Sequence, residues 1–233
     1  MSSKPCILIV GAGDGLSASL ARVFAGEGGF RVALASRHPE RLTALARELG
    51  GMALRCDASD ALEVNSLFND LDKAFDSALD VVIYNAAQRV RGPITEVEPS
   101  AVAQALAVSA FGGFLVAQQA ARSMLRRGRG TILFTGASAS VKGYPHSAAF
   151  AMGKFALRGL AQSLARELAP LGIHVGHVVI DGAIRHPDRP ESGHGPDSML
   201  DPDAIARSYL HLVRQDRSAW SWELELRPWV ERF

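Results

Sequence analysis

The sequence has little cysteine, few aromatic residues and almost no net charge in its 233 residues. The two cysteines, Cys6 and Cys56, are too few for a disulfide framework and lack metal-site spacing, which predicts buried small side chains in a reduced compartment. A formal charge of +1 predicts no nucleic-acid or anionic-membrane partner. Since the N-terminal apolar run is too short for a signal peptide or a membrane span, the expectation is a soluble cytoplasmic protein.

Short apolar segments alternate with longer helical patterns, and no internal repeat or linker divides the chain. The segments typical of strands are 6–10, 31–36, 52–56, 80–85, 131–135 and 173–180, with an edge-like strand at 222–227. The helical patterns are 16–28, 39–50, 62–75, 101–126, 147–169 and 204–214. This alternation predicts an α/β fold, a single domain over residues 1–233 with a doubly wound parallel sheet and helices on both faces.

A composition shift marks residues 181–203, which are rich in Pro, Gly, Asp and His. They follow an expected strand and predict a loop at its carboxyl end. Doubly wound folds bind ligands at that edge of the sheet.

A glycine-rich turn follows the first expected strand and opens the first helix. Gly11, Gly13 and Gly15 allow a pyrophosphate to approach the backbone at a helix N-terminus. Asp14 lies within this turn, and Leu16 occupies the third glycine site of GxGxxG. A purely structural turn is the alternative, but the position between strand and helix favours dinucleotide binding.

The end of the second expected strand carries Ser36 and Arg37 instead of the carboxylate that would bind the ribose hydroxyls of NAD. An arginine there can hold a 2′-phosphate, which favours NADP(H) over NAD(H). The alternative is a solvated loop charge. Asp57, just after the third strand, is either a helix cap or an acceptor for the adenine amine, and both roles stay open.

Over nearly its whole length the sequence resembles the short-chain dehydrogenase/reductase family. The family pattern TGxxxGxG aligns with VGAGDGLS, and NNAG aligns with YNAA, where Asn85 and Ala86 match. The family's PG after the sixth strand corresponds to Asp181 and Gly182 at the nicotinamide end. The resemblance implies a Rossmann-type fold, a nicotinamide cofactor, and a homodimer or homotetramer paired through the helices at 101–126 and 147–169.

The resemblance also implies which residues form the catalytic site. Family members use Ser, Tyr and Lys, usually with Asn. YxxxK falls on FAMGK, so Lys154 matches the lysine and Phe150 replaces the tyrosine, while Ala137 replaces the serine and Ser109 the asparagine. Because a phenyl ring has no proton to donate, the usual tyrosine general acid is excluded, which indicates an atypical branch of the family.

Lys154 and three nearby polar residues keep alternatives open. Lys154 either binds the nicotinamide ribose or carries its ammonium to the surface past an apolar helix stripe. A displaced proton donor is conceivable at Ser138, Tyr144 or His146, and the alternative for each is an ordinary solvated loop residue. The loops at 90–96, 141–146 and 184–199 are expected to wall the substrate pocket.

These observations give an oxidoreductase hypothesis and a rival. The first is an NADP(H)-dependent enzyme that transfers a hydride to or from a small carbonyl or alcohol, with a proton from water, Tyr144, His146 or the substrate. The alternative is a catalytically silent NADP(H)-binding protein that acts as a sensor or assembly partner. A third possibility is a fold that no longer binds the cofactor.

Overall fold

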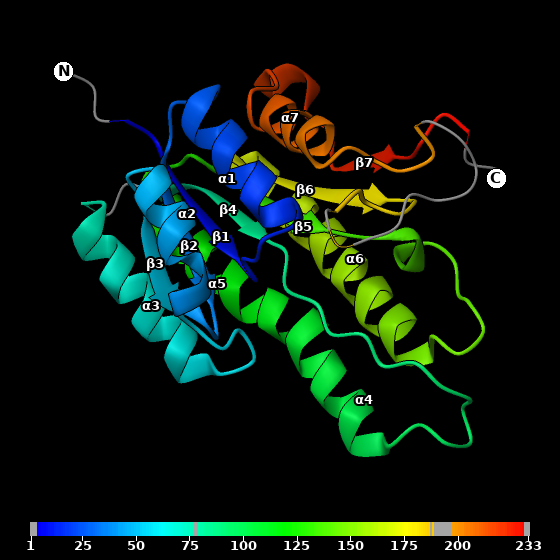
Figure 1. The fold of residues 1–233 in the computed structure, drawn as a ribbon. Coiled ribbons are helices and arrows are strands. Elements are labelled where there is room, and N and C mark those ends of the chain that lie inside the picture. Colours follow the sequence, from blue (N-terminus) through cyan, green and yellow to red (C-terminus); the bar gives the residue numbers. More distant parts are fainter. Residues whose placement is uncertain (1–3, 77–78, 187, 189–196, 231–233) are drawn as a thin grey trace.

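A computed structural model describes residues 4–76, 79–186, 188 and 197–230 (Figure 1). Its seven-stranded sheet is parallel throughout and has the order β3-β2-β1-β4-β5-β6-β7. The strands are β1 (Cys6–Val10), β2 (Arg31–Ser36), β3 (Met52–Arg55), β4 (Leu79–Tyr84), β5 (Gly130–Thr135), β6 (Ile173–Ile180) and β7 (Glu223–Leu226). The predicted parallel α/β fold is confirmed.

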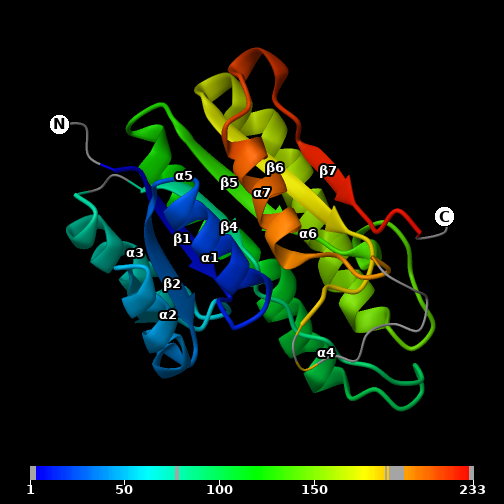
Figure 2. The same ribbon diagram turned by 45° about the horizontal axis from the view of Figure 1, so that its top comes forward.

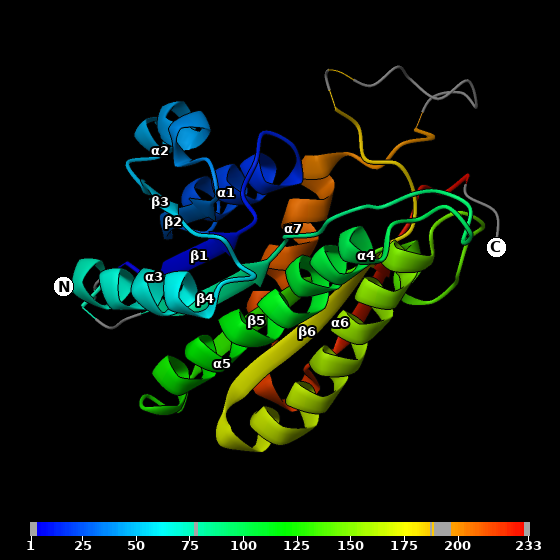
Figure 3. The same cartoon turned by 90° about the horizontal axis from the view of Figure 1, so that it is seen from below.

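Helices cover both faces of this sheet. The α-helices are α1 (Leu16–Gly26), α2 (Thr43–Glu48), α3 (Ala61–Ala74), α4 (Pro99–Leu106), α5 (Gly112–Leu125), α6 (Ala148–Leu168) and α7 (Pro202–Val213). One apolar core lies between the sheet and α1, α2 and α7, and Figure 2 shows α1 beside α7 over that face. A second core lies beneath α3, α5 and α6, which Figure 3 shows from the other side. Both faces of the central strands are therefore buried, which explains their continuous apolar sequences.

Two predicted helices differ from their expected form. The segment 39–50 divides into a 3-10 turn, η1 (Pro39–Leu42), and the short helix α2. The segment 101–126 starts earlier, with Pro99 at its first turn, and contains a π-helical turn, η2 (Ala107–Phe111). Proline suits a helix start, because the missing N–H would lack a helical partner there, but periodicity alone shows neither the 3-10 nor the π turn.

The helical stretch from α4 through α5 is apolar and long. Pro99–Leu125 is long and apolar enough to cross a membrane, but core helices of globular proteins can have the same length and composition. On the described chain, Val116 and Ala120 of this stretch are fully buried in the core beneath α3, α5 and α6. Packing against the sheet accounts for this part of its apolar composition.

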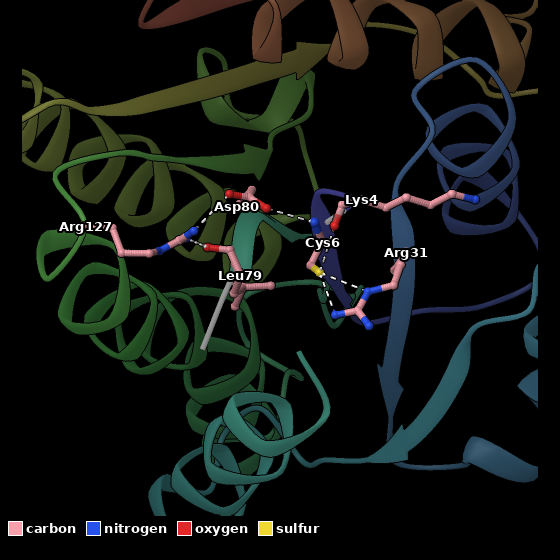
Figure 4. Close-up of polar contacts among 6 residues, drawn as sticks. All are labelled: Lys4, Cys6, Arg31, Leu79, Asp80 and Arg127. Atoms are coloured by element: carbon pink, nitrogen blue, oxygen red, sulfur yellow. Dashed lines mark hydrogen bonds and ion pairs between the residues drawn. The ribbon is translucent and has the colours of Figure 1, made fainter. Parts of the chain in front are cut away.

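Polar contacts join the amino-terminal ends of the central strands (Figure 4). The Asp80 carboxylate accepts hydrogen bonds from the Cys6 backbone N–H at 2.9 Å and from Arg127 Nη1 at 3.0 Å. Arg31 donates to the Cys6 Sγ atom at 3.3 and 3.4 Å. Cys6 and Cys56 are buried and unpaired, as expected, and burial raises the pKa of each thiol. This edge of the sheet is thus occupied by structural contacts.

Candidate functional site

The glycine turn lies against the end of β4 at the opposite, carboxyl edge of the sheet. Gly11 has φ +79°, and a Cβ atom there would lie 2.4 Å from the Ala86 backbone, so no side chain fits. Asn85 Nδ2 donates to Ser17 Oγ at 2.7 Å, and that hydroxyl donates to the Gly11 carbonyl at 3.2 Å. Asn85 therefore fixes the turn from the neighbouring strand.

A pocket of about 360 Å³ opens between this turn and the ends of β2, β3 and β4. It brings together seven of the predicted cofactor residues: Gly11, Gly13, Asp14, Ser36, Arg37, Asp57 and Asn85. The other two predicted turn residues do not line it. Gly15 precedes α1 and faces the His186 ring, and Leu16 is buried in the core. They shape the helix start.

Two further residues, His38 and Arg41, line the same pocket and were not predicted as cofactor-binding from the sequence. Arg41 lies in η1, which begins at Pro39 and whose 3-10 geometry was not predicted. The available signal was a second arginine four residues after Arg37. The pocket therefore has two guanidinium groups at the end of β2, a suitable arrangement for an anionic group such as a phosphate.

Asp57 lines the pocket and does not cap a helix, so the cap alternative is wrong. The cap of α3 is Asp60, whose Oδ1 accepts from the N–H groups of Leu62 and Glu63 at 2.7 and 3.0 Å. Asp57 Oδ1 instead accepts from the backbone N–H and the hydroxyl of Ser59. Burial opposes ionisation of Asp57, but these hydrogen bonds and the charge of Arg37 outweigh it and hold its pKa below the usual range.

Lys154 is buried on α6, with 3% of its surface exposed, so the alternative of a surface-reaching ammonium is wrong. Its Nζ atom donates to the Thr135 carbonyl, at the end of β5, at 2.6 Å. Burial and the nearby charge of Arg89 lower its pKa to about 7. The lysine thus sits at the carboxyl edge of the sheet, on the same edge as the glycine turn.

The Phe150 ring is close to two basic side chains. The Lys154 Nζ atom is 5.8 Å from the Phe150 ring centroid, and the Arg89 guanidinium carbon lies over the ring at 4.6 Å. The negative face of an aromatic ring attracts cations, so the ring stabilises both. Arg89 is itself held in place, because Ser109 Oγ accepts from the N–H of its neighbour Gln88 at 3.1 Å.

A second pocket, of about 420 Å³, lies beside Phe150. Its walls come from the segment after β4, the turn η3 (Ser138–Ser140), the following loop and the start of α6. The lining residues are Arg89, Arg91, Ser138, Ala139, Tyr144, Pro145, Ser147 and Phe150. Two of the three predicted wall segments, 90–96 and 141–146, therefore contribute to it. Arg89 was missed because only the fold places it over Phe150 of α6.

The remaining predicted catalytic positions lie around this pocket. Ser138 and Tyr144 line it. Ala137 does not; its backbone N–H donates to Ser140 Oγ at 3.1 Å. His146 is exposed and is not among the described lining residues. Hydrogen bonds with Asp181 and Tyr144 raise the pKa of Lys142, which places an ammonium beside the Tyr144 phenol.

Asp181 and Gly182 fix the turn after β6 and line neither pocket. Asp181 is buried and pairs with Lys142 at 3.2 Å and Arg227 at 3.6 Å. A Cβ atom on Gly182 would lie 2.8 Å from the Pro228 ring, so the turn packs on the C-terminal segment. Within the predicted loop 181–203, and within the third predicted wall 184–199, residues 187 and 189–196 lie outside the described residues.

Known proteins resemble this chain over nearly its full length. A sequence profile of the family described as short chain dehydrogenase matches residues 5–187. A relative from Melia azedarach, named (21S)-21-acetoxyl-apo-melianone synthase SDR, is 30% identical over 91% of this chain and 83% of its own.

Two solved structures share the fold. A short-chain dehydrogenase from Rhodopseudomonas palustris is 36% identical, with a TM-score of 0.82 over 98% of this chain and 100% of its own. A metagenomic short-chain oxidoreductase in complex with NADP is 26% identical, with a TM-score of 0.82 over 96% of this chain and 97% of its own.

The buried ammonium gives a testable dependence of stability on pH. Because the pKa of Lys154 is about 7 in the folded chain and about 10.4 when unperturbed, the unfolded chain binds one more proton between these values. The contribution of Lys154 to the free energy of unfolding of the wild type therefore increases as the pH rises from 7 to 10. We expect the melting temperature of the nucleotide-free wild type to rise relative to that of Lys154→Met across this range, and the difference to be constant below pH 7.

The matched control is Lys73→Met, since Lys73 is an exposed lysine on α3. The difference in melting temperature between the wild type and Lys73→Met should not increase between pH 7 and 10. Parallel pH profiles for the wild type and Lys154→Met would contradict the lowered pKa.

Proposed function

Because the chain belongs to the short chain dehydrogenase family, we propose that it is an NADP(H)-dependent oxidoreductase that acts on a small carbonyl or alcohol. We further propose that it represents an atypical branch with a non-standard catalytic site. The observation that carries the proposal is the pocket where the glycine turn meets Arg37 and Arg41, on the same sheet edge as buried Lys154.

The first pocket suits the adenosine half of NADP(H). Backbone N–H groups around Gly13, at the start of α1, would bind the pyrophosphate. Arg37 and Arg41 would hold the 2′-phosphate through charge-assisted hydrogen bonds, and the Asp57 carboxylate would accept from the adenine amine. NADP is also the ligand of the metagenomic relative, and this likeness supports the choice.

Lys154 would bind the nicotinamide ribose. An ammonium has three donor hydrogens, and the Thr135 carbonyl accepts one of them. Ribose hydroxyls could accept the others, which would offset the cost of burying the charge. This role does not require a tyrosine hydroxyl at position 150.

The proton must come from a group other than Phe150. NADPH, when bound, would supply a hydride to the carbonyl carbon. We assign the proton on the carbonyl oxygen to the Tyr144 phenol, which lines the second pocket beside the Lys142 ammonium, with Ser138 on the same wall. His146 has no position in that lining and is not assigned a role.

The rival proposal is a catalytically silent NADP(H)-binding protein. The observation that favours it is the pair Phe150 and Ala137, whose side chains carry no hydrogen-bonding group at positions where the family has Tyr and Ser. Cofactor binding is common to both proposals, and turnover separates them.

Cofactor choice is tested by nucleotide titration calorimetry. Arg37→Ala and Arg41→Ala should each weaken NADPH binding by roughly 10-fold to 100-fold, the usual size of a hydrogen bond to a charged group, and leave NADH binding unchanged. Arg47→Ala is the control, an exposed arginine on α2 outside the pocket. If the variants lose the same affinity for NADPH and NADH, the assigned contact with the 2′-phosphate is wrong. If the wild type does not bind NADPH, the proposed function is wrong.

Turnover is tested by NADPH oxidation with a panel of aldehydes and ketones. Tyr144→Phe should lower kcat roughly 100-fold or more, as loss of a general acid does, and leave NADPH affinity unchanged. His146→Gln is the control and should keep full activity. NADPH binding without turnover of any substrate would favour the silent rival, and full activity in Tyr144→Phe would exclude Tyr144 as the proton donor.

The proposal includes a homodimer or homotetramer. Phe111 and Phe114, on η2 and α5, stack at 6.2 Å and are exposed, as are Met152 and Phe155 on α6. We expect sedimentation to give two or four times the 24.9 kDa chain mass. Phe155→Glu should dissociate the assembly, whereas Leu62→Glu, at an exposed position on α3, should not. A wild-type monomer at tens of micromolar would refute the pairing.

A further inference from the structure

His177 is a polar residue in a fully buried strand. Every residue of β6 is buried, and none of the His177 surface is exposed. Val175, two positions earlier, belongs to the core beneath α3, α5 and α6, and strand alternation directs the His177 ring to the same face. Burying a polar ring is costly unless it is hydrogen-bonded. The imidazole therefore needs partners, and β7 and α6 supply them.

The Glu223 carboxylate of β7 holds one edge of the His177 ring. Nδ1 of the ring lies 3.0 Å from Glu223 Oε2. Since an ionised carboxylate only accepts, Nδ1 carries the hydrogen and donates. Arg158 of α6 donates to both Glu223 oxygens at 2.6 and 2.8 Å, and its hydrogen bonds lower the pKa of Glu223. The carboxylate therefore stays ionised and joins the ring to α6.

The His177 ring is uncharged at neutral pH. Burial lowers the pKa of the imidazole to about 4, and the charges of Lys154 and Arg158 lower it further against the effect of Glu223. Lys154 and Arg158 are four positions apart and share one face of α6. Glu223 balances the charge of Arg158. The neutral ring thus adds no further positive charge to these two.

The opposite edge of the ring lies against Gly136, the residue after β5. A Cβ atom on Gly136 would lie 2.5 Å from His177 Nε2 and 2.8 Å from the Val178 carbonyl oxygen, so no side chain fits there. The Gly136 N–H donates to the same Val178 carbonyl at 2.7 Å. Two neighbouring residues of β6 therefore fix this glycine.

The peptide that joins Thr135 to Gly136 carries the acceptor for Lys154. Its carbonyl, that of Thr135, accepts from Lys154 Nζ at 2.6 Å. The Thr135 hydroxyl accepts from Tyr209 of α7 at 2.9 Å, which holds the residue from the other face of the sheet. Because the His177 ring packs on the glycine of this peptide, a change in the ring would move the acceptor and the ammonium with it.

We propose that His177 is a positioning residue for Lys154. Glu223 holds the ring, the ring supports the peptide between Thr135 and Gly136, and the peptide carbonyl holds the ammonium. The inference rests on the proposed function for its consequence, because a fixed ammonium would be placed to bind the nicotinamide ribose. The positioning itself belongs to the nucleotide-free protein.

The first test follows the titration of Lys154 without nucleotide. The charged and titratable groups that face Lys154 are Arg89 from the segment after β4 and His177 from β6. In His177→Ala the peptide loses its support and water reaches the ammonium, so the pKa of Lys154 should rise from about 7. The melting temperature of His177→Ala should then begin to rise relative to that of His177→Ala/Lys154→Met at least about one pH unit above the corresponding point for the wild type and Lys154→Met.

His174→Ala is the matched control. His174 is also buried on β6, but it lies three positions away, so it faces the other side of the sheet and stacks on Trp220 at 4.8 Å. Its loss should lower the melting temperature at every pH without moving the Lys154 titration. His177→Asn keeps an N–H group for Glu223 and serves if His177→Ala does not fold; it should give a smaller shift of the same sign. An unmoved titration in the His177 variants, or an equal shift in His174→Ala, would overturn the positioning role.

Nucleotide titration calorimetry connects the positioning to the cofactor. At pH 6, where Lys154 is charged in both proteins, His177→Ala should weaken NADPH binding roughly 10-fold, whereas His174→Ala should not. The probe 2′,5′-ADP lacks the nicotinamide ribose and should bind equally to all three proteins.

The two measurements fail independently. If the wild type does not bind NADPH, the proposed function fails, and the Lys154 titration still decides the positioning role. If the wild type binds NADPH and the titration does not move in the His177 variants, the proposed function stands and the positioning role is overturned. An unchanged NADPH affinity in a variant whose Lys154 titration has moved would overturn the consequence for the cofactor.

Discussion

The hydrogen bond from Lys154 to the Thr135 carbonyl joins the longest helix of the described chain to the carboxyl edge of the sheet. A buried ammonium is costly, and the lowered pKa of Lys154 expresses that cost. Its position is fixed by packing, because Leu157 and Ala161 of α6 are fully buried beneath the sheet. The helix that supplies core packing therefore also presents a cation to the edge where the glycine turn lies.

Local sequence patterns predict the frame of this site but not all of its charges. Strand and helix periodicity, together with the order glycine turn, Arg37 and Asn85, was sufficient to predict the fold and seven of the residues that line the first pocket. Arg41 could not be placed, because its direction depends on the 3-10 turn at Pro39. Arg89 could not be placed either, because its role arises from a contact with Phe150, 61 positions away in the chain.

The family alignment describes Phe150 by what it lacks, whereas the structure gives the ring contacts of its own. The ring contacts both Lys154 and Arg89 and attracts both through its face. A tyrosine could stack in the same way, so the ring alone does not explain the missing hydroxyl. Burial, together with the repulsion between Arg89 and Lys154, lowers the pKa of Lys154 to about 7, and the contact with the ring partly offsets that repulsion.

The two edges of the sheet differ in how their charges are balanced. At the amino-terminal edge, Asp80 forms an ion pair with Arg127 and accepts a hydrogen bond from the Cys6 backbone N–H, so its charge is balanced within the chain. At the carboxyl edge, Arg37 and Arg41 line the first pocket together with Asp14 and Asp57, and the second pocket has Arg89 and Arg91 and no carboxylate among its described lining residues. The formal charge of +1 conceals this separation, because it sums over the whole surface. A local positive excess attracts anionic ligands even when the net charge is near zero. The arginines of the carboxyl edge would suit the phosphate groups of the proposed NADP(H) cofactor.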